Sequence, residues 1–558
     1  MLTASEISKL LNEFGKLTDL SGETFKARAY YVAAENLLAH PTPLEQVIAQ
    51  NKLRTIPGVG EAIAEKIMRL HRTGSHPTLD FMRQQYPAGL LEMFEIPGLG
   101  AKKIEIIYGT LKLSTLEELE AACKDGRIAE CKGLGKAIQA KIVKGLEMMR
   151  SNKGALLADA ADNRLHGAVE QLRASSPELK KVEAAGEVRR GCEVVTQLTI
   201  AVCSEEGASV VAPQPEITIA MGTPENYGAA LIFATGSNPH LDGLKKCASD
   251  LGLTLSEKGL FNKKKLLDCA TEEDVYGALK LSYIPPELRE GLGEIEAARK
   301  GAPKLVALTD LRGILHSHTT YSDGARSLAD MAEAVRKRGY QYYGVADHSK
   351  SAAYAGGLKE DRVKEQQQLA DSLNKDYASE HAKGKLKGGR FKIFKGIESD
   401  ILEDGSLDYA PDVLASFDFI VASIHSRFSL TRPEQTARLI NAVSNPRTTI
   451  LGHMTGRLLL KRDGYDVDID AVLKACAEHG VAVEINAHPP RLDLDWRYHQ
   501  RALELGCMLS INPDAHDISE IDLVRYGVNV ARKGGVPPDH VLNCKPLDEI
   551  EAYFAKRK

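Results

Sequence analysis

Histidines and carboxylates follow a short apolar run in the C-terminal half of the chain. The run 313–318 ends in His316 and His318, and Asp323 comes shortly after it. Side chains two residues apart on a strand point to the same side, so both imidazoles can reach one ion. Imidazole nitrogens combined with carboxylate oxygens suit Zn²⁺, Mn²⁺ or Fe²⁺. The pattern therefore predicts a metal site at the end of this run.

Six further runs of β-branched and apolar residues end in the same way, at 342–347, 391–397, 417–424, 448–452, 481–486 and 507–512. The side chains that end or follow them are Asp347, His348, Glu398, His425, His453, Glu484, Asn486, His488, Asp514 and His516. One histidine after a strand is usually structural, but a repeated pattern of this kind needs another explanation. A single structural zinc would not need so many ligands. Two or three ions would hold a phosphate and lower the pKa of a bound water, so we predict hydrolysis of a phosphoester.

The elements between these runs are amphipathic, as in 327–339 and 468–480. Short apolar runs that alternate with amphipathic helices predict parallel strands with helical crossovers. Seven such units predict a closed barrel with one unit fewer than the common eight. In a parallel barrel all strand ends meet at one mouth, which would bring the candidate side chains together.

Three segments of the N-terminal part repeat one pattern: Gly-x-Gly followed by an amphipathic helix. They are Thr55–Ile67, Glu95–Ile107 and Cys131–Val143, with glycines at 58 and 60, 98 and 100, and 133 and 135. Such a turn exposes backbone N–H groups at a helix start, which suits a phosphate. A capped turn between two helices explains one copy equally well. Three copies favour binding of a nucleic-acid backbone through Gly58, Gly60, Gly98, Gly100, Gly133 and Gly135.

The composition of the 558 residues is that of a globular chain with three or four domains, 43% hydrophobic and 27% charged. No apolar run approaches the ~18 residues of a membrane span. The first residues predict an amphipathic helix capped by Ser5, without the features of a signal peptide. Nine scattered cysteines favour reduced thiols and a cytoplasmic location. The net charge of −4 does not indicate nucleic acid, so any such binding must come from local geometry.

The strand-end motifs resemble those of the polymerase-and-histidinol-phosphatase (PHP) domain. They read "LHSHTTYSDG", "ADHS", "GIESDIL", "ASIHSRF", "GHMTGRLL", "EINAHPPRLDL" and "PDAH". With "FKARAYYVAAENL", "ALIFATGSNPH" and "YIPPELREGLGEIEAA", the whole chain is similar to bacterial family X DNA polymerases that carry a PHP domain. The resemblance implies a multidomain fold: an α-helical helix-hairpin-helix N-terminal region, an α+β nucleotidyltransferase-like middle region and a C-terminal distorted (β/α)7 barrel.

The resemblance also implies five segments. Residues 1–85 would form a helical DNA-binding domain with one helix-hairpin-helix, and 86–150 a fingers-like domain with two. A degenerate palm and thumb-like region would span 151–290, a linker 291–311 and the PHP phosphoesterase domain 312–558. A monovalent cation at the hairpin loops is a further expectation.

In this family the barrel holds two or three divalent ions, here Mn²⁺, Zn²⁺ or Fe²⁺. By motif match the ligands would be His316, His318, Asp323, His348, Glu398, His425, His453, Asp514 and His516, with Glu398 as a bridge. The expected catalytic residues are Glu398, His348 and Arg457.

The stretch Gly186–Val202, "GEVRRGCEVVTQLTIAV", departs from the family at the polymerase site. Family members carry Asp-x-Asp there, which holds the two Mg²⁺ ions of nucleotidyl transfer. This chain has Gln197 and Thr199 instead, and the third aspartate falls on Thr218, with Glu216 as an open alternative. Neutral side chains are poor magnesium ligands, so we expect no Mg²⁺ here and a lost polymerase activity.

The flanking residues of this stretch leave two readings open. The serine expected near the triphosphate is Glu187, which would repel a polyanion. Arg189 and Arg190 either bind a DNA phosphate or form a solvated turn paired with Glu193.

The favoured function is a DNA-binding, metal-dependent 3′–5′ exonuclease or end-processing nuclease in DNA repair. Its partner would be gapped, nicked or 3′-ended DNA without sequence preference. We expect no membrane partner and a monomer. Three alternatives stay open: an active family X polymerase with an associated exonuclease in base excision repair, a DNA-end binding scaffold, and a small-molecule phosphatase, which would leave the hairpin motifs without purpose.

Overall fold

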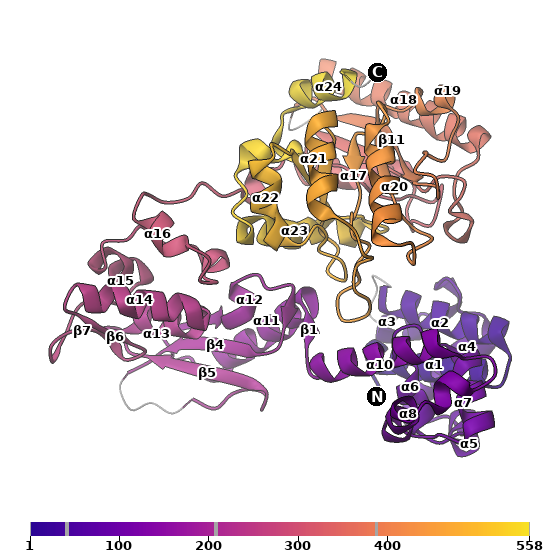
Figure 1. Cartoon of the computed structure of the whole chain (residues 1–558), viewed down its shortest axis with the longest axis horizontal. Helices are drawn as coiled ribbons and strands as arrows, with labels where there is room; N and C mark the ends of the chain where they lie inside the picture. Colours follow the sequence, from indigo (N-terminus) through magenta and orange to yellow (C-terminus); the bar gives the residue numbers. More distant parts are fainter. Residues whose placement is uncertain (1, 40–43, 206–209, 385–388, 557–558) are drawn as a thin grey trace. The chain divides into compact units, whose positions relative to one another are not determined.

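The computed structural model describes residues 2–39, 44–205, 210–384 and 389–556. Two compact units divide the chain, residues 1–153 and residues 154–558 (Figure 1). The first is helical, and the second contains an α+β region followed by a barrel. None of the described helices is long and apolar enough to cross a membrane.

The first unit consists of helices that surround two apolar cores. Their bounds are α1 Ala4–Leu20, α2 Thr24–Ala39, α3 Leu44–Ala49, η1 Leu53–Thr55, α4 Glu61–Thr73, α5 Pro77–Gln85, α6 Gly89–Met93, α7 Ala101–Leu111, α8 Leu116–Lys124, α9 Arg127–Glu130 and α10 Lys136–Ser151. One core is built around Phe14 and Ile67, and the other around Ile104 and Leu146. The expected segments 1–85 and 86–150 thus each contain one core.

The cap of α1 differs from the expectation. Thr3, not Ser5, precedes the helix: its hydroxyl accepts from the backbone N–H of Glu6, whose carboxylate accepts from the Thr3 N–H. This reciprocal pair is a capping box, which sequence reasoning placed two residues too late.

Each Gly-x-Gly pair opens a helix, as its pattern predicts. Helices α4, α7 and α10 start directly after their N-cap residues Gly60, Gly100 and Gly135. The preceding Gly58, Gly98 and Gly133 have φ values of 77°, 79° and 95°, a left-handed conformation that favours glycine.

The α+β region contains two three-stranded sheets and one two-stranded sheet. Strands β2 (Lys181–Ala185), β4 (Leu198–Cys203) and β5 (Ile217–Gly222) form the first in the order β2-β4-β5. The second contains β6 (Thr254–Ser256), β7 (Gly259–Asn262) and β8 (Lys265–Leu266), and β1 (Leu156–Leu157) pairs with β3 (Val194–Val195). The helices are α11 Ala158–Ser175, α12 Gly186–Arg189, α13 Tyr227–Thr235, α14 Asn238–Asp250, α15 Glu272–Ala278 and α16 Glu294–Ala298.

The segment 291–311, expected as a linker, is partly packed. Ala298 of α16 is buried in the core that α13–α15 share, while Val306 is buried in the core of the barrel. The segment therefore contributes to both neighbouring cores.

The seven apolar runs all form strands of one parallel sheet. They are β9 Gly313–Ile314, β10 Tyr342–Val345, β11 Lys392–Asp400, β12 Phe419–Ser423, β13 Ile450–Leu451, β14 Ala482–Asn486 and β15 Leu509–Asn512, hydrogen-bonded in chain order. Beyond the strand ends, a bridge between Ser317 and Ala515 brings the first and last strands together. The result is a nearly closed seven-stranded barrel.

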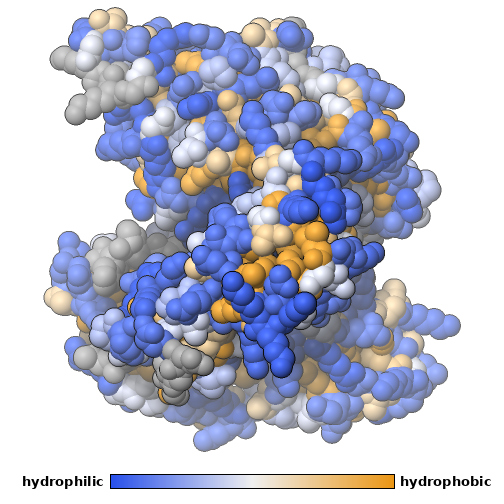
Figure 2. Space-filling view, turned by 90° about the vertical axis from the view of Figure 1, so that its left-hand side faces the viewer, coloured by the Kyte–Doolittle hydropathy of each residue, from blue (hydrophilic) through white to orange (hydrophobic). Residues whose placement is uncertain are grey.

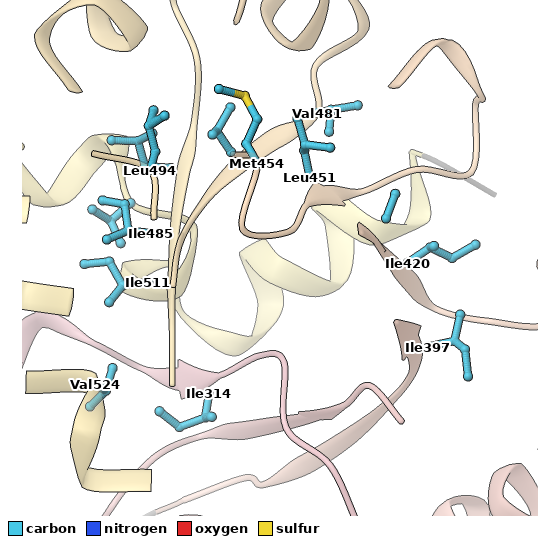
Figure 3. Packing of buried hydrophobic residues seen from close by; sticks show 14 of the residues in the cluster. Ile314, Ile397, Ile420, Leu451, Met454, Val481, Ile485, Leu494, Ile511 and Val524 are labelled. Atoms are coloured by element: carbon cyan, nitrogen blue, oxygen red, sulfur yellow. The ribbon is translucent and has the colours of Figure 1, made fainter. Parts of the chain in front are cut away.

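Helices surround this barrel and bury its outer face. They are α17 Leu328–Lys337, α18 Glu360–Ala382, α19 Pro411–Leu414, α20 Arg432–Ser444, α21 Ile469–His479, α22 His499–Glu504, α23 Val524–Lys533 and α24 Leu547–Ala555. Branched side chains such as Ile397, Ile420 and Ile485 point outward from the strands into the helical layer (Figure 3). On the side of the molecule seen in Figure 2 the surface is mainly hydrophilic, with an apolar area near its middle.

Helix α24 closes the amino ends of the strands. Phe554 stacks on Phe419 at a centroid distance of 5.2 Å and meets Phe394 edge-on at 5.0 Å. Both partners lie near the start of their strands, β12 and β11. Because α24 covers the amino ends of the strands, the open mouth of the barrel is at their carboxyl ends.

Candidate metal centre

All nine side chains predicted as metal ligands meet at the mouth of the barrel. Three groups place their nitrogen and oxygen atoms within 4.8 Å of one another: His318, Asp323, His348 and His516; His316, His318 and Asp514; and His348, Glu398 and His425. Because His318 and His348 each belong to two groups, the three groups form one continuous cluster. His453 joins it through Glu398.

Glu398 lies at the centre of the cluster. Its Oε1 is 3.0 Å from His453 Nε2, 3.2 Å from His425 Nε2 and 3.4 Å from His316 Nε2. Its Oε2 is 2.8 Å from His348 Nδ1. One carboxylate therefore contacts histidines on both of its sides, which is the arrangement of a bridging ligand.

The two aspartates lie on the outer sides of the cluster. Asp514 Oδ1 is 2.9 Å from His318 Nε2 and 3.4 Å from His316 Nε2. Asp323 is 3.5 Å from His348 Nε2 and 3.4 Å from His516 Nε2.

The unsatisfied atoms of the cluster fit a set of divalent ions. His316 Nε2, His348 Nδ1 and Glu398 Oε2 are buried without a hydrogen-bond partner among the described residues. Burying such atoms is costly unless something pairs with them. Ligands about 2.1 Å from a shared ion lie roughly 3.0–3.5 Å from one another, which matches most of the separations above. The donor set, imidazole with carboxylate, suits Zn²⁺, Mn²⁺ or Fe²⁺.

Two further carboxylates accept hydrogen bonds from candidate ligand histidines, on the ring nitrogen that faces away from the cluster. His316 Nδ1 donates to Glu484 at 2.6 Å, and His425 Nδ1 donates to Asp400 at 2.6 Å. Such a bond fixes the tautomer and leaves Nε2 free for an ion. Sequence reasoning counted Glu484 as a strand-end candidate but missed Asp400. The available signal was its position two residues after Glu398, on the same face of β11.

Of the other strand-end candidates, Asn486 donates to Glu484 and to Asp514, whereas Asp347 supports a loop. Asp347 accepts hydrogen bonds from the hydroxyls of Thr319 and Ser322, and from Gln366. It therefore fixes the turn after β9 and is not part of the cluster.

When no ion is bound, several histidines of the cluster are protonated and form ion pairs with its carboxylates. Burial disfavours a charged imidazole, but Glu398 and Asp323 overcome this and raise the pKa of His348 to about 10. His425 and His516 likewise have pKa values raised to about 9 against burial, by Glu398 and by Asp323 respectively. Burial lowers the pKa of His318 to about 3, which keeps it neutral.

Three residues of the cluster have left-handed backbone conformations. The φ values are 63° for His316, 20° for His453 and 52° for Asp514. Residues with side chains adopt such values at a cost that surrounding structure must offset, and they concentrate at functional sites. Here they turn the chain sharply where the strands end.

Arg457, predicted as catalytic, uses its guanidinium within its own loop. It pairs with Asp495 at 2.6 Å and donates to the carbonyls of Arg491 and Leu492. None of these partners belongs to the metal cluster. A catalytic role for Arg457 stays a prediction that this geometry does not support.

The polymerase positions form a neutral polar patch. Gln197 Nε2 donates to Thr218 Oγ1 at 3.2 Å, and Thr199 is the cross-strand partner of Thr218 in the β4–β5 ladder. Gln197, Thr199 and Thr218 therefore lie together. Glu216 pairs with Arg164.

Glu187 closes one side of this patch. Its carboxylate accepts from the backbone N–H of Gln197 at 3.0 Å and from the Thr196 hydroxyl. Among the described residues, no cluster of three or more His, Cys, Asp or Glu side chains of the kind found at the barrel mouth includes or surrounds Gln197, Thr199 and Thr218.

Both arginines of the "VRR" turn are held in ion pairs. Arg189 binds Glu272 with two bonds of 2.7 and 2.8 Å. Arg190 binds Glu290 at 2.9 Å. Neither pairs with Glu193, which binds Trp496 and Arg497 of the barrel. The expected solvated turn paired with Glu193 is therefore wrong: both arginines are largely buried and pair with Glu272 and Glu290.

The hairpin loops leave open space at their helix starts. A side chain built at Gly60, Gly98, Gly100 or Gly135 would meet nothing within 4 Å, whereas one at Gly58 would collide with Val32 at 2.6 Å and one at Gly133 would touch Ile106. Four of the six predicted glycines therefore border space that a phosphate can enter.

Models of known domain families match four parts of the chain. A helix-hairpin-helix domain matches residues 3–76, and a SAM-like helix-hairpin-helix tandem matches 90–148. The DNA polymerase beta thumb matches 230–290, and the PHP domain matches 315–488. The PHP match implies binding of divalent metal ions, and the other matches imply binding of DNA.

Curated relatives match the whole chain or its barrel. A protein named DNA polymerase/3′-5′ exonuclease PolX from Bacillus subtilis (strain 168) is 32% identical over 99% of this chain and 99% of its own length. A probable phosphatase of Thermoanaerobacter sp. (strain X514) is 26% identical over 44% of this chain and 94% of its own length. A probable phosphatase of Vibrio atlanticus (strain LGP32) is 27% identical over 42% of this chain.

Proposed function

Because this chain belongs to the bacterial family X DNA polymerases that carry a PHP domain, we propose that it is a DNA-binding, metal-dependent phosphoesterase. Its reaction would be hydrolysis of the terminal phosphodiester at a DNA 3′ end, as a 3′–5′ exonuclease or end-processing nuclease in DNA repair. The observation that carries this proposal is the cluster around Glu398, in which several buried nitrogen and oxygen atoms, His316 Nε2 and Glu398 Oε2 among them, make no hydrogen bond to the described residues.

The cluster residues would hold two or three ions of Mn²⁺, Zn²⁺ or Fe²⁺. When bound, such ions supply a water of lowered pKa and positive charge opposite the phosphate oxygens. The chain itself positions the imidazoles: Glu484 and Asp400 fix His316 and His425 through their Nδ1 atoms. Glu398 would bridge two ions, and His348 would be a ligand at the boundary between two of the groups.

DNA binding would occur through the hairpin loops of the first unit. Support comes from the helix starts after Gly60, Gly100 and Gly135, where the first N–H groups have no partner within the helix and a Cβ added at the glycine would meet nothing within 4 Å. Contacts of this kind read the backbone and not the sequence. A monovalent cation at these loops stays a prediction.

The polymerase activity that the Bacillus relative's name includes would be absent here. Support comes from the neutral patch of Gln197, Thr199 and Thr218, which offers no carboxylate to anchor Mg²⁺. We include in this proposal the five-segment division, supported by separate apolar cores in the hairpin helices, the thumb-like region and the barrel, with residues 291–311 packed into the last two of these cores. The cytoplasmic location and monomeric state stay predictions. All nine cysteines are described and none forms a disulfide.

The test is cleavage of 3′-labelled DNA by the double variant His316→Ala, His318→Ala in the presence of Mn²⁺. We expect cleavage to fall below detection and the bound metal, measured by mass spectrometry of the purified protein, to drop. His381→Ala, which removes an exposed histidine at the end of α18, is the matched control and should change neither.

The outcomes separate the alternatives. Wild-type cleavage that survives in the metal-depleted double variant would contradict the proposal. Wild-type protein that binds DNA but cleaves nothing would indicate the scaffold, and hydrolysis of small phosphomonoesters alone would indicate a phosphatase.

A further inference from the structure

We infer that Tyr354 and Arg491 recognise a nucleotide at the mouth of the barrel: the arginine holds an oxygen of the scissile phosphate and the tyrosine stacks on the terminal base. This inference rests on the proposed function and names its substrate class. The site would take a phosphodiester that carries a nucleobase, not a small phosphomonoester.

Tyr354 lies next to the metal cluster but is not part of it. It belongs to the turn η4 (Ala353–Ala355), and its ring centroid is 6.0 Å from His348 and 6.4 Å from His425. The residue is 66% exposed, which is unusual for a large aromatic side chain in this chain. A flat, exposed ring beside a phosphate site is the surface on which nucleobases stack, whatever their identity.

Arg491 lies on the opposite part of the cluster, next to Asp514. Its Nε is 3.8 Å from Asp514 Oδ2, and its side chain is only 22% exposed. The structure gives its guanidinium no hydrogen bond to the described residues, whereas the guanidinium of Arg457 donates three hydrogen bonds within its own loop. A half-buried guanidinium with unused donors suits a phosphate, which accepts two N–H groups at once.

The two side chains together favour a nucleotide over a simpler ester. The Tyr354 ring lies beside His348 and His425, and Arg491 lies beside Asp514, so both side chains border the cluster at which a phosphate would bind. A small phosphomonoester would use the arginine but would leave the tyrosine ring uncovered. A 3′-terminal nucleotide would use both.

The experiment compares two oligonucleotides, one with a normal 3′-terminal base and one with an abasic 3′-terminal residue. Tyr354→Ala should raise KM for the normal oligonucleotide about tenfold and leave the abasic one unchanged, because only stacking is lost. Tyr354→Phe should keep wild-type values on both. Arg491→Ala should raise KM for both about tenfold or more, because both contain the phosphate.

Two variants serve as controls. Tyr498→Ala removes another partly exposed tyrosine of the barrel, and Arg390→Ala removes an arginine that pairs with Asp548 of α24 at the closed end. Neither should change KM. Bound metal should be equal in all variants, which shows that the cluster itself is intact.

A binding measurement gives a readout independent of turnover. The probe is an oligonucleotide with 2-aminopurine at its 3′ end and a non-hydrolysable methylenephosphonate as its last linkage. Stacking on Tyr354 should quench the fluorescence in wild-type and Tyr354→Phe protein, and the quenching should be lost in Tyr354→Ala.

Equal loss on normal and abasic oligonucleotides in Tyr354→Ala, or unchanged quenching, would overturn the stacking role. Unchanged KM in Arg491→Ala would overturn the phosphate role. These results are distinct from failure of the proposed function, in which wild-type protein would cleave neither oligonucleotide.

Discussion

Glu398 shows why a single residue can organise this site. Buried within β11, it would be costly as an isolated charge. The histidines around it, foremost His425 and His348, nevertheless hold its pKa well below the ordinary value, so the carboxylate stays ionised despite burial. An ionised carboxylate at this buried position favours positive charge beside it, either as protonated histidine or as a metal ion.

The proton content of the cluster makes metal binding depend on pH. His348, with a pKa raised to about 10, and His425 and His516, with values of about 9, carry protons at neutral pH when no ion is bound. A metal ion needs the neutral imidazole and must displace these protons. We therefore expect metal affinity to rise with pH from about 7 to about 9, by roughly tenfold per pH unit for each displaced proton.

Calorimetry of Mn²⁺ or Zn²⁺ binding in buffers of different ionisation enthalpy measures this release directly. Binding heats that do not depend on the buffer would contradict the expectation. Asp412→Asn, a change at an exposed carboxylate on α19, should leave the proton release unchanged.

At the scale of elements, the seven strand ends were predictable because parallel strands repeat one rule. Each apolar run gave a strand, and the topology of the barrel brought nine distant side chains to one mouth. Position along the chain was a useful guide, because each candidate ligand lies in the carboxyl-terminal part of its strand, as Glu398 does in β11, or in the loop that follows it, as Asp323 does after β9.

Contacts made by loops and turns were not predictable in this way. Tyr354 and Arg491 stand in turns whose conformation depends on packing with other elements, and no periodicity marks them. The partner of Arg190 was equally hidden, because Glu290 lies 100 residues away. Sequence reasoning therefore identified the candidate ligands that the fold brings together, but it missed neighbouring residues such as Asp400 and Tyr354.

The hairpin loops allow a test of DNA binding that spares the fold. Gly60 and Gly100 have extended backbone conformations and open space around them, so a valine there should not disturb the helices. The added side chain would instead keep a phosphate away from the N–H groups. We expect the Gly60→Val, Gly100→Val variant to bind duplex DNA several-fold more weakly, with a salt dependence reduced by about 0.9 per lost phosphate contact.

Fluorescence anisotropy with labelled DNA at several salt concentrations measures both quantities. Gly109→Val, on the open side of α7 away from the loop, is the matched control and should bind as wild type. If the double variant keeps its helical circular dichroism and binds like the control, the loops are ordinary helix turns.

At the scale of the whole second unit, the α+β region is joined to the barrel by charged contacts. Glu290 binds both Arg190 and the barrel residue Lys533, and Arg532 binds Glu287 at 2.6 Å. Arg190 is thus paired with a carboxylate and donates to the backbone carbonyl of Thr235, so its guanidinium is not free to bind a triphosphate. The α+β region would then serve as a support for the barrel.

Loss of DNA synthesis is the expectation that follows from this arrangement. Nucleotidyl transfer needs carboxylates that hold two Mg²⁺ ions against the charge that develops on the transferred phosphate. The side chains at these positions are neutral: Gln197 donates a hydrogen bond to Thr218, and Thr199 lies opposite Thr218 on the neighbouring strand. The carboxylate of Glu187 adds negative charge beside them. Without that stabilisation the rate should fall by many orders of magnitude, not a few-fold.

The measurement is primer extension with Mg²⁺ or Mn²⁺ by the His316→Ala, His318→Ala protein, in which cleavage cannot hide synthesis. We expect no templated incorporation. Incorporation of even one templated nucleotide would refute this expectation and would direct attention to Glu216, the alternative position for the third aspartate, which is paired with Arg164. The complementary variant restores aspartate at 197, 199 and 218 and serine at 187. Because these positions already lie together on β4, β5 and the adjoining turn, synthesis gained by this variant would show that only the side chains, and not the backbone, separate this chain from a polymerase.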